Sequence, residues 1–493
     1  MATDTAQNWL GKRARGLTVR PVRALMLVLA LLMVALAGCH SFKPLPAGLS
    51  YAGPEQPVSD IRFLADQTWV DDNGDRHVSQ EIFDAAFALI DGAQSLIVAD
   101  LFLYNDWQGP IPETTRALSD ELTQKLIAKK QGSPEIQIVL ITDPVNTLYG
   151  GLESAQFERL SAAGVIVVET DLNKLRDSNK FYSPFWRLFV KPFGNSTGGA
   201  LPNPIGPGKV SLRTYLKLFN FKANHRKTVI ADRNGELVAV VASANPHDGS
   251  SAHRNAGLEF NGPAVVDLLE TENAVLRMSA LPVVPTEPWR RNAMDAAPVA
   301  TLRVVTEEKI RDAILDELNT VGEGDHVDLM MFYLSSSKVI AALRRAHRAG
   351  ARVRIMLDPN KDAFGREKSG VPNRPAARGL HRDGVPIRWC ETSGEQCHAK
   401  MLTIHRVDGT STLLSGSANF TRRNLGDLNL ETDVQVTAAT NSNVMQDAQR
   451  YFDGAWLNLD GRQASVAYEV YQNDSLWLRF VYRFNEFTGF NSY

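Results

Sequence analysis

Two stretches of the sequence each combine an imidazole, an ammonium group and an amide at closely similar spacing. They are NHRKTVIADRNGELVAVVASAN (224–245) and CHAKMLTIHRVDGTSTLLSGSAN (397–419), in which the final Asn follows the His by 20 and 21 positions. The shared positions are His225, Lys227, Ser243 and Asn245 in the first stretch and His398, Lys400, Ser417 and Asn419 in the second. A histidine can act as nucleophile or acid, while lysine and amide groups bind phosphoryl oxygens. The pattern therefore predicts chemistry on a phosphate ester.

Hairpins are expected to position these side chains. Asn234-Gly235 and Asp408-Gly409 are strong hairpin-turn signals within the two stretches. Residues two apart on a strand share a face, so each His and its Lys should point the same way. The Ser and Asn then return along the neighbouring strand. One such motif is often only a surface pair, but two matched copies indicate a shared function.

The surrounding sequence reads as an internal duplication. QIVLITDP (137–144) matches VRIMLDPN (353–360), and SLIVADLFLYND (95–106) matches HVDLMMFYLSS (326–336). These apolar runs alternate with helical patterns, which predicts largely buried mixed or parallel sheets in an α/β fold.

HRKTVIAD with ASAN, and HAKMLTIH with GSAN, resemble the paired HxKxxxxD and GSxN motifs of the phospholipase D superfamily. The similarity covers about residues 60–460. It implies two pseudo-symmetric α/β halves with mixed sheets and an active site at their interface. It also implies phosphodiester cleavage or exchange through a covalent phosphohistidine, without a metal or another cofactor.

The resemblance also implies roles for individual residues. His225 would be the nucleophile and His398 the general acid and base, with the reverse assignment left open. Two carboxylates further along would orient the histidines, and the other motif residues would complete the catalytic set. These residues are Glu259 and Glu431, and Lys227, Asp232, Ser243, Asn245, Lys400, Ser417 and Asn419.

The motifs depart from the family pattern at two positions. His405 stands where the second motif should have the counterpart of Asp232, and Ala242 replaces a glycine that is frequent in the first. Neither change removes a central residue, so we expect an active enzyme. His247 and His253 follow Asn245 and are either substrate contacts or ordinary loop residues. No Cys/His cluster has metal-ligand spacing.

The resemblance, the composition and the proline-rich stretches together divide the chain into six segments. These are a signal peptide (1–38), a tether (39–60), a first half (61–276) with an insertion (171–221), a linker (277–300), a second half (301–460) and an aromatic tail (461–493).

The insertion is rich in aromatic and basic residues. Between 178 and 221 these are Phe181, Tyr182, Phe185, Trp186, Phe189, Phe193, Tyr215, Phe219 and Phe221, with Lys180, Arg187, Lys191, Lys209, Arg213 and Lys217. This composition suits the headgroup region of an anionic membrane. It also suits stacking on single-stranded nucleic acid, or a small core packed over the site.

The N-terminus has a basic region followed by ALMLVLALLMVALAG (24–38), which fits a secretory signal better than a membrane span. Leu36-Ala37-Gly38-Cys39 resembles the lipobox of bacterial lipoproteins, with Cys39 as the lipidated residue. An uncleaved anchor helix is the alternative. The first interpretation predicts a lipid-anchored protein on the periplasmic side of the bacterial envelope. The absence of Asp at residue 40 favours the outer membrane over the inner.

The cysteines and the net charge give further information on the compartment and the partners of the chain. Besides Cys39, the chain holds only Cys390 and Cys397, which form a disulfide in an oxidising compartment or are two unrelated thiols. The formal net charge is −2, and residues 1–38 contribute five basic groups and one acid, so the remainder is more acidic. This charge argues against a nucleic-acid partner.

Three functions remain open, with phospholipid as the expected substrate of the first two. The chain is a cardiolipin synthase-like phosphatidyltransferase, a phospholipase D that transfers to water, or a nuclease of the superfamily. A non-catalytic tether that uses its aromatic tail is a fourth interpretation. The lipid anchor and the insertion favour lipid, and the sequence does not decide between transfer and hydrolysis.

Overall fold

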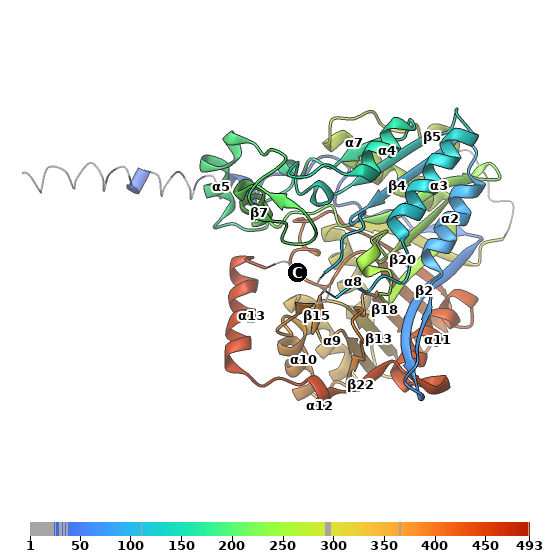
Figure 1. The fold of residues 1–493 in the computed structure, drawn as a ribbon. Helices are drawn as coiled ribbons and strands as arrows, with labels where there is room; N and C mark the ends of the chain where they lie inside the picture. Colours follow the sequence, from blue (N-terminus) through green and yellow to red (C-terminus); the bar gives the residue numbers. More distant parts are fainter. Residues whose placement is uncertain are drawn as a thin grey trace, which may run out of the picture.

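The fold is built on two large mixed sheets (Figure 1). The computed structural model describes residues 38–493 except 110, 291–296, 364–365 and 492, and before them residues 24, 26–28, 32 and 35. Most of the predicted signal peptide 1–38 and part of the predicted linker 277–300 therefore lie outside the described residues.

The first sheet has antiparallel strands on one side and parallel strands on the other. β9 pairs antiparallel with β10 and β4, whereas β4, β5 and β6 run parallel. Its order is β21 (Arg462–Gln463), β2 (Ile61–Asp71), β11 (Asn255–Asn261), β10 (Glu236–Ala242), β9 (Lys227–Arg233), β4 (Leu96–Leu101), β5 (Gln137–Thr142) and β6 (Ile166–Glu169), with β3 (Arg76–Ser79) beside β2.

The second sheet repeats this arrangement. Its order is β1 (Gln56–Val58), β12 (Ala300–Thr306), β20 (Thr432–Ala439), β19 (Thr410–Gly416), β18 (Lys400–His405), β13 (His326–Met331), β14 (Arg352–Leu357), β17 (Ile387–Cys390) and β22 (Ser465–Ala467). The series from β12 to β17 follows the order of β2 to β6, with the same parallel and antiparallel pairings. The predicted α/β class with mixed sheets is confirmed, and the common strand order fits the predicted duplication.

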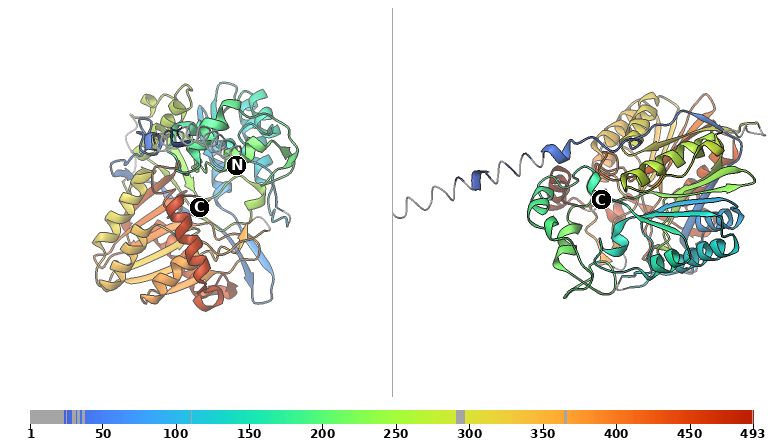
Figure 2. Two further views of the ribbon diagram at one scale, coloured as in Figure 1. Left: turned by 90° about the vertical axis from the view of Figure 1, so that its left-hand side faces the viewer. Right: turned by 90° about the horizontal axis from the view of Figure 1, so that it is seen from above.

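Helices cover the sheets on their outer sides (Figures 1 and 2). α9 illustrates why they form, because its buried Val339, Leu343 and Ala346 recur at helical spacing. The larger helices are α2 (Ile82–Gly92), α3 (Leu118–Gly132), α4 (Ala155–Ala162), α7 (Pro263–Met278), α8 (Glu308–Thr320), α9 (Ser337–Arg348), α10 (Asn373–Arg382), α11 (Asn443–Leu457) and α13 (Leu476–Thr488). One buried cluster joins Ile230 of the first sheet to Met401 of the second, so the sheets share a core.

The halves exchange segments. Residues 39–60 were predicted to be a tether, but β1 pairs with β12, and Gly53 donates to Val304 O at 2.8 Å. In return, β21 from the predicted tail pairs with β2 of the first sheet. The tether interpretation is therefore wrong from about residue 51 onward, because the backbone groups of this segment complete a sheet edge.

The insertion 171–221 runs between β6 and β9. It contains α5 (Ser183–Phe189), the short hairpin β7 (Leu201–Pro202) and β8 (Lys209–Val210), and α6 (Leu212–Leu218). Figure 1 shows it at upper left, above α13.

A buried ion pair crosses between the halves and should carry much of their mutual stability. Fully buried Arg226 donates to Glu307 at 2.8 Å and to Glu272 at 3.2 Å. We expect Arg226→Ala to lower the free energy of unfolding by about 3–5 kcal/mol, because it leaves buried carboxylates unpaired.

Urea denaturation of the purified chain measures this effect. The control is Arg62→Ala, since Arg62 is 59% exposed in its pair with Glu259 and should cost about 1 kcal/mol or less. Equal losses for the two variants would contradict the importance of the buried pair.

Candidate active site

Each motif histidine is held by the opposite half of the chain. The strands begin at Lys227 and Lys400, and the histidines lie just upstream in parallel bridges that join Asn224 to Leu430 and Cys397 to Arg254. His225 N–H donates to Leu430 O at 2.8 Å, and His398 N–H donates to Arg254 O at 2.8 Å.

The same bridges give each imidazole a different partner. His225 Nδ1 lies 3.0 Å from Glu431 Oε2, and His398 Nδ1 lies 3.1 Å from Asn255 Oδ1. The Asn255 amide is oriented by its Nδ2, which donates to His253 O at 3.0 Å. Its Oδ1 therefore faces His398 as an acceptor, so Nδ1 of His398 carries a hydrogen and Nε2 is free to face the substrate.

The motif serines position these partners. Ser417 Oγ donates to Glu431 Oε2 at 2.5 Å, and Ser243 Oγ donates to Asn255 Oδ1 at 3.0 Å. The two serines accept from Thr432 N–H and Ala256 N–H at 3.0 and 3.1 Å respectively. Because these contacts are equivalent, Asn255 is the first-half counterpart of Glu431. Both serines are buried and act as positioning residues.

Glu259 does not have its predicted role. Its carboxylate pairs with Arg62 and Arg233, and it lies four residues along β11 from Asn255, which is about 13 Å on a strand. The family resemblance implies a carboxylate for this role, whereas the structure has the amide of Asn255 at the equivalent position.

Asp232 also lies away from the chemistry. It is at the far end of β9, where its carboxylate accepts from the N–H groups of Gln94, Ser95 and Leu96 at 2.8–3.3 Å. It caps the turn before β4 and is structural. His405, in the corresponding position of β18, instead contacts Ser411 Oγ at 2.6 Å. The missing motif carboxylate is therefore remote from the reacting centre.

Two phenylalanines that the sequence analysis missed pack on the motifs. Lys227 and Lys400 lie 4.9 and 5.0 Å from the ring centroids of Phe102 and Phe332. The same rings contact His225 and His398 at 4.7 and 4.8 Å. Each follows its strand, β4 or β13, within the duplicated apolar runs, so aligning those runs could have identified them.

Burial and cationic neighbours shift the pKa values at the site. Burial, with Lys227 and Lys400 nearby, holds the pKa of His225 well below its usual value, and burial with Lys400 does the same for His398. Burial lowers the pKa of Lys227 to about 7 and raises that of Glu431 to about 8. Bound phosphate anion would oppose the effect of the lysines and favour their charged forms.

A cavity of about 420 Å³ contains both histidines and brings residues of both halves together. Asn245 and Asn419 line it, and among the described atoms Asn419 Oδ1 is buried without a hydrogen-bond partner. His247 and His253 also line this cavity, where burial lowers both pKa values. Its apolar wall includes Phe102, Val145, Leu218, Phe221 and Phe332. The arrangement suits a phosphoryl group with an apolar substituent.

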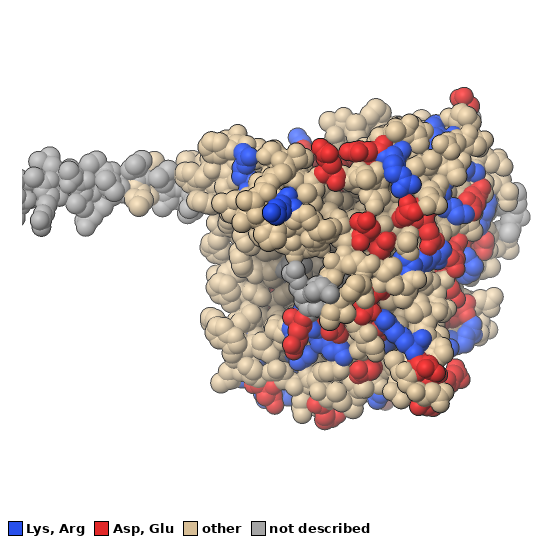
Figure 3. Space-filling model, in the orientation of Figure 1, with Lys and Arg blue, Asp and Glu red and all other residues tan. Residues whose placement is uncertain are grey.

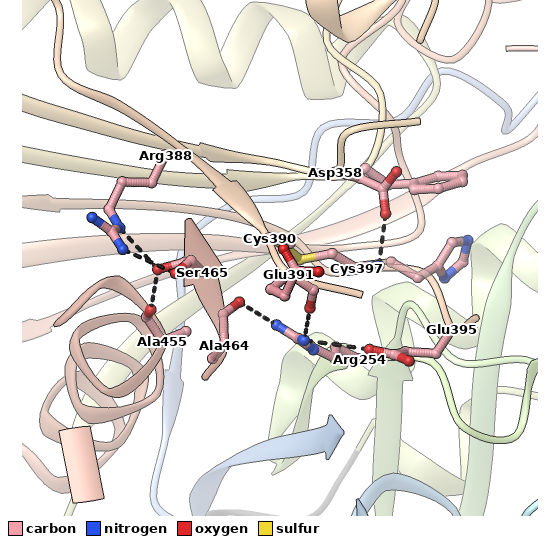
Figure 4. The surroundings of a disulfide bond; sticks show 12 residues. Arg254, Asp358, Arg388, Cys390, Glu391, Glu395, Cys397, Ala455, Ala464 and Ser465 are labelled. Carbon is pink, nitrogen blue, oxygen red and sulfur yellow. Dashed lines mark hydrogen bonds and ion pairs between the residues drawn. A yellow bond between two sulfur atoms is a disulfide. The ribbon is translucent and has the colours of Figure 1, made fainter. Parts of the chain in front are cut away.

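The predicted disulfide is present. Cys390, at the end of β17, bonds to Cys397, which precedes His398. Figure 4 shows Arg254 beside it, donating to Ala464 O at 2.6 Å and pairing with Glu395 at 3.3 Å, while Cys397 N–H donates to Asp358. The disulfide and these contacts therefore fix both ends of the segment 390–397, which leads directly to His398.

Cys39 is a free, exposed thiol. None of the described helices is long and apolar enough to cross a membrane.

Residues 314–456 match the family model described as cardiolipin synthase, PLD-like domain. No curated protein matches the chain in sequence. The fold is similar to that of phosphatidylserine synthase from Haemophilus influenzae, with a TM-score of 0.51, 12% identity, and coverage of 89% of this chain and 96% of that one.

Two further solved structures are more distant. Polyphosphate kinase from Porphyromonas gingivalis has a TM-score of 0.44 and 12% identity, covering 87% of this chain and 53% of that one. The phospholipase D family member Nuc from Salmonella typhimurium has a TM-score of 0.26 and 17% identity, covering 33% and 97%.

The fold and the paired histidine-lysine site define a phosphoryl-transfer protein with one centre built from two halves. The family match identifies residues 314–456, within the second half, as a PLD-like domain, and the likeness to phosphatidylserine synthase shows a common fold over most of the chain.

Two matched substitutions test the different roles of Glu431 and Glu259. Glu431→Gln should lower turnover on the order of 10²–10⁴-fold, because His225 loses its charged partner. Glu259→Gln should leave the rate nearly unchanged, since that side chain pairs only with surface arginines. Steady-state rates of the two folded variants measure this, and a similar loss in both variants would support the predicted role of Glu259.

Proposed function

We propose that the chain is a phosphatidyltransferase that moves the phosphatidyl group of one phospholipid to an alcohol. The observation that carries the proposal is the pair of unequal histidines in one cavity, His225 against Glu431 and His398 against Asn255. A phospholipase D that transfers the same group to water is the alternative outcome.

In the first half-reaction, Nε2 of His225 attacks phosphorus while Nδ1–H donates to Glu431. The bond from phosphorus to the leaving oxygen breaks, and Nε2–H of His398 gives that oxygen its proton. In the second half-reaction His398 takes the proton of the acceptor hydroxyl, whose oxygen attacks phosphorus. The phosphorus–nitrogen bond breaks and His225 is released.

The partners support these roles. A phosphohistidine is cationic while it forms, and the developing charge favours the ionised form of Glu431 beside it. Asn255 is neutral and gives no such support, so protonated His398 remains a strong acid. This difference favours His225 as nucleophile and His398 as the proton donor.

Lys227 and Lys400 supply the charge for the phosphoryl oxygens. Each Nζ donates to the carbonyl of its own motif histidine at 2.6 Å, which directs both ammonium groups toward the reacting centre. Asn245 and Asn419 line the same cavity and can donate to those oxygens.

A phospholipid substrate is supported by the apolar wall of the cavity and by the cardiolipin synthase description of the matching family model. The fold of a phosphatidylserine synthase is consistent with this choice. The mildly acidic net charge argues against nucleic acid.

The proposal includes the cell envelope as the site of action. Residues 1–38 would be removed as a signal, and Cys39 would carry the lipid anchor on the periplasmic side, in the outer rather than the inner membrane. The exposed thiol of Cys39 is sterically available for that modification.

Product analysis tests the reaction. The full chain is mixed with vesicles of phosphatidylglycerol and phosphatidylethanolamine, and the lipids are read by mass spectrometry. Cardiolipin and a released small alcohol are the expected products, and both should disappear in His225→Ala and in His398→Ala. Phosphatidic acid alone would make the chain a hydrolase. No lipid product from the folded chain would contradict the proposed substrate class.

The pH profile of kcat/KM tests the division of roles. Asn255→Asp places a carboxylate 3.1 Å from the present position of His398 Nδ1 and should raise the pKa of that imidazole. A general acid must be protonated, so the alkaline limb should move up by roughly one pH unit or more. A shift of the acidic limb instead would make His398 the nucleophile. Asn255→Ala controls for loss of the hydrogen bond alone.

A further inference from the structure

α13 presents its apolar face outward. Phe487 is 80% exposed, Trp477 67% and Phe480 58%, and the exposed residues recur at helical spacing along one face. This face consists of Leu476, Trp477, Phe480, Arg483, Phe484 and Phe487.

The inner side of α13 makes polar contacts with the body. Tyr482 Oη donates to Ser335 O at 3.2 Å, and partly buried Glu486 lies near Arg422 and Arg423. A helix that packs on a core normally has the opposite arrangement, with its apolar face inward. A run of exposed aromatic side chains of this length is typical of an interaction surface.

The insertion extends this surface. Phe181 contacts Phe487 with ring centroids 6.2 Å apart, and Phe219 stacks on Phe490 at 5.7 Å. On and around α5, the insertion exposes four phenylalanine side chains, namely Phe181, Phe185, Phe189 and Phe193. Figure 2 shows α13 and the insertion side by side on one side of the molecule.

The surface is cationic. Residues 178–221 contain no Asp or Glu, and Lys180, Lys191 and Arg483 are exposed along the aromatic rings. In Figure 3 the insertion at upper left shows isolated Lys and Arg among uncharged side chains, whereas acidic groups gather farther right. Aromatic rings with interspersed cations complement anionic lipid headgroups.

The same surface borders the active-site cavity. Ile205, Leu218 and Phe221 of the insertion and Tyr493 after α13 all line that cavity. Phe221 also contacts Phe490 at 5.7 Å, which joins the cavity wall to the exposed rings.

We infer that α13 and α5 form a docking surface for an anionic phospholipid bilayer, which directs the mouth of the cavity toward the headgroups. Substrate would enter from the membrane side without crossing water. This consequence for substrate entry rests on the proposed phospholipid activity, whereas the docking itself does not.

The N-terminal segment approaches the bilayer on the same side. Phe42, 78% exposed, lies under Lys180 Nζ at 5.5 Å, and Asp177 N–H donates to His40 O at 3.2 Å. Phe42 lies three residues after Cys39, the predicted site of the lipid anchor. A bilayer therefore fits this surface better than a second protein does.

Trp477 provides a direct probe of docking. The full chain and its Trp477→Phe variant are added to vesicles of phosphatidylglycerol and phosphatidylethanolamine whose acyl chains carry bromine. The chain has 8 tryptophans, so the emission of Trp477 is obtained by subtracting the fluorescence spectrum of the variant from that of the full chain. We expect about a twofold loss of the Trp477 signal, because bromine quenches rings that reach the acyl region.

Paired serine variants test the contribution of the surface to turnover. Phe480→Ser with Phe484→Ser should abolish the quenching of Trp477 and lower the initial rate on vesicles roughly tenfold, because apolar contact with the bilayer is lost. The rate on a short-chain phosphatidylglycerol below its micellar concentration should not change. Val407→Ser with Leu457→Ser is the matched control, since these side chains are 74% and 56% exposed on other elements.

The outcomes separate docking from catalysis. Absence of Trp477 quenching in the parent chain would overturn the docking surface. A dimer of the parent chain that becomes a monomer in the Phe480→Ser, Phe484→Ser variant would also overturn it. Quenching without turnover of either substrate would keep the surface and contradict the proposed function. Equal rate losses on vesicles and on the short-chain lipid would also overturn the inference, because they would indicate damage to the fold.

Discussion

Two short backbone bridges between the halves, Asn224 to Leu430 and Cys397 to Arg254, determine the geometry of the catalytic centre. Each bridge fixes one histidine and brings it to a side chain from the opposite half. Buried Arg226, two residues after Asn224, and buried Arg254, which is itself a bridge residue, add ion pairs across the same boundary. Because neither half supplies both a histidine and its partner, the active centre requires the assembled fold, and the exchanged β1 and β21 strands secure that assembly.

A second constraint is the concentration of buried ionisable groups at the active site. Lys227 and Lys400 are buried, and burial lowers the pKa of each lysine while raising that of Glu431. Such groups are costly to bury without an ion between them. A phosphoryl group supplies that negative charge, and its oxygens can accept hydrogen bonds from the amide N–H groups of Asn245 and Asn419, which line the cavity. The site is thus organised for the bound substrate.

The sequence predicted the repeated parts well because strand patterns and hairpin turns are local. The His, Lys, Ser and Asn of each motif do meet at one cavity or directly behind it, and the Cys390–Cys397 bond was correctly expected. The errors concern partners far apart in the chain. The family resemblance predicts a carboxylate and so indicates Glu259, whereas the register across strands that brings Asn255 to His398 is not visible in one sequence. Residues 51–58 looked like a tether because their pairing strand lies over 240 positions away, as Ala52 with Val305 shows.

The most direct test of a centre with unequal histidines is to locate the covalent intermediate. The full chain is incubated with phosphatidylglycerol, denatured at alkaline pH and digested, and the histidine peptides are analysed by mass spectrometry. The account predicts a phosphatidyl adduct on His225, with Glu431→Gln reducing it. An adduct on His398, or turnover without an adduct on either histidine, would contradict the division of roles between the two halves.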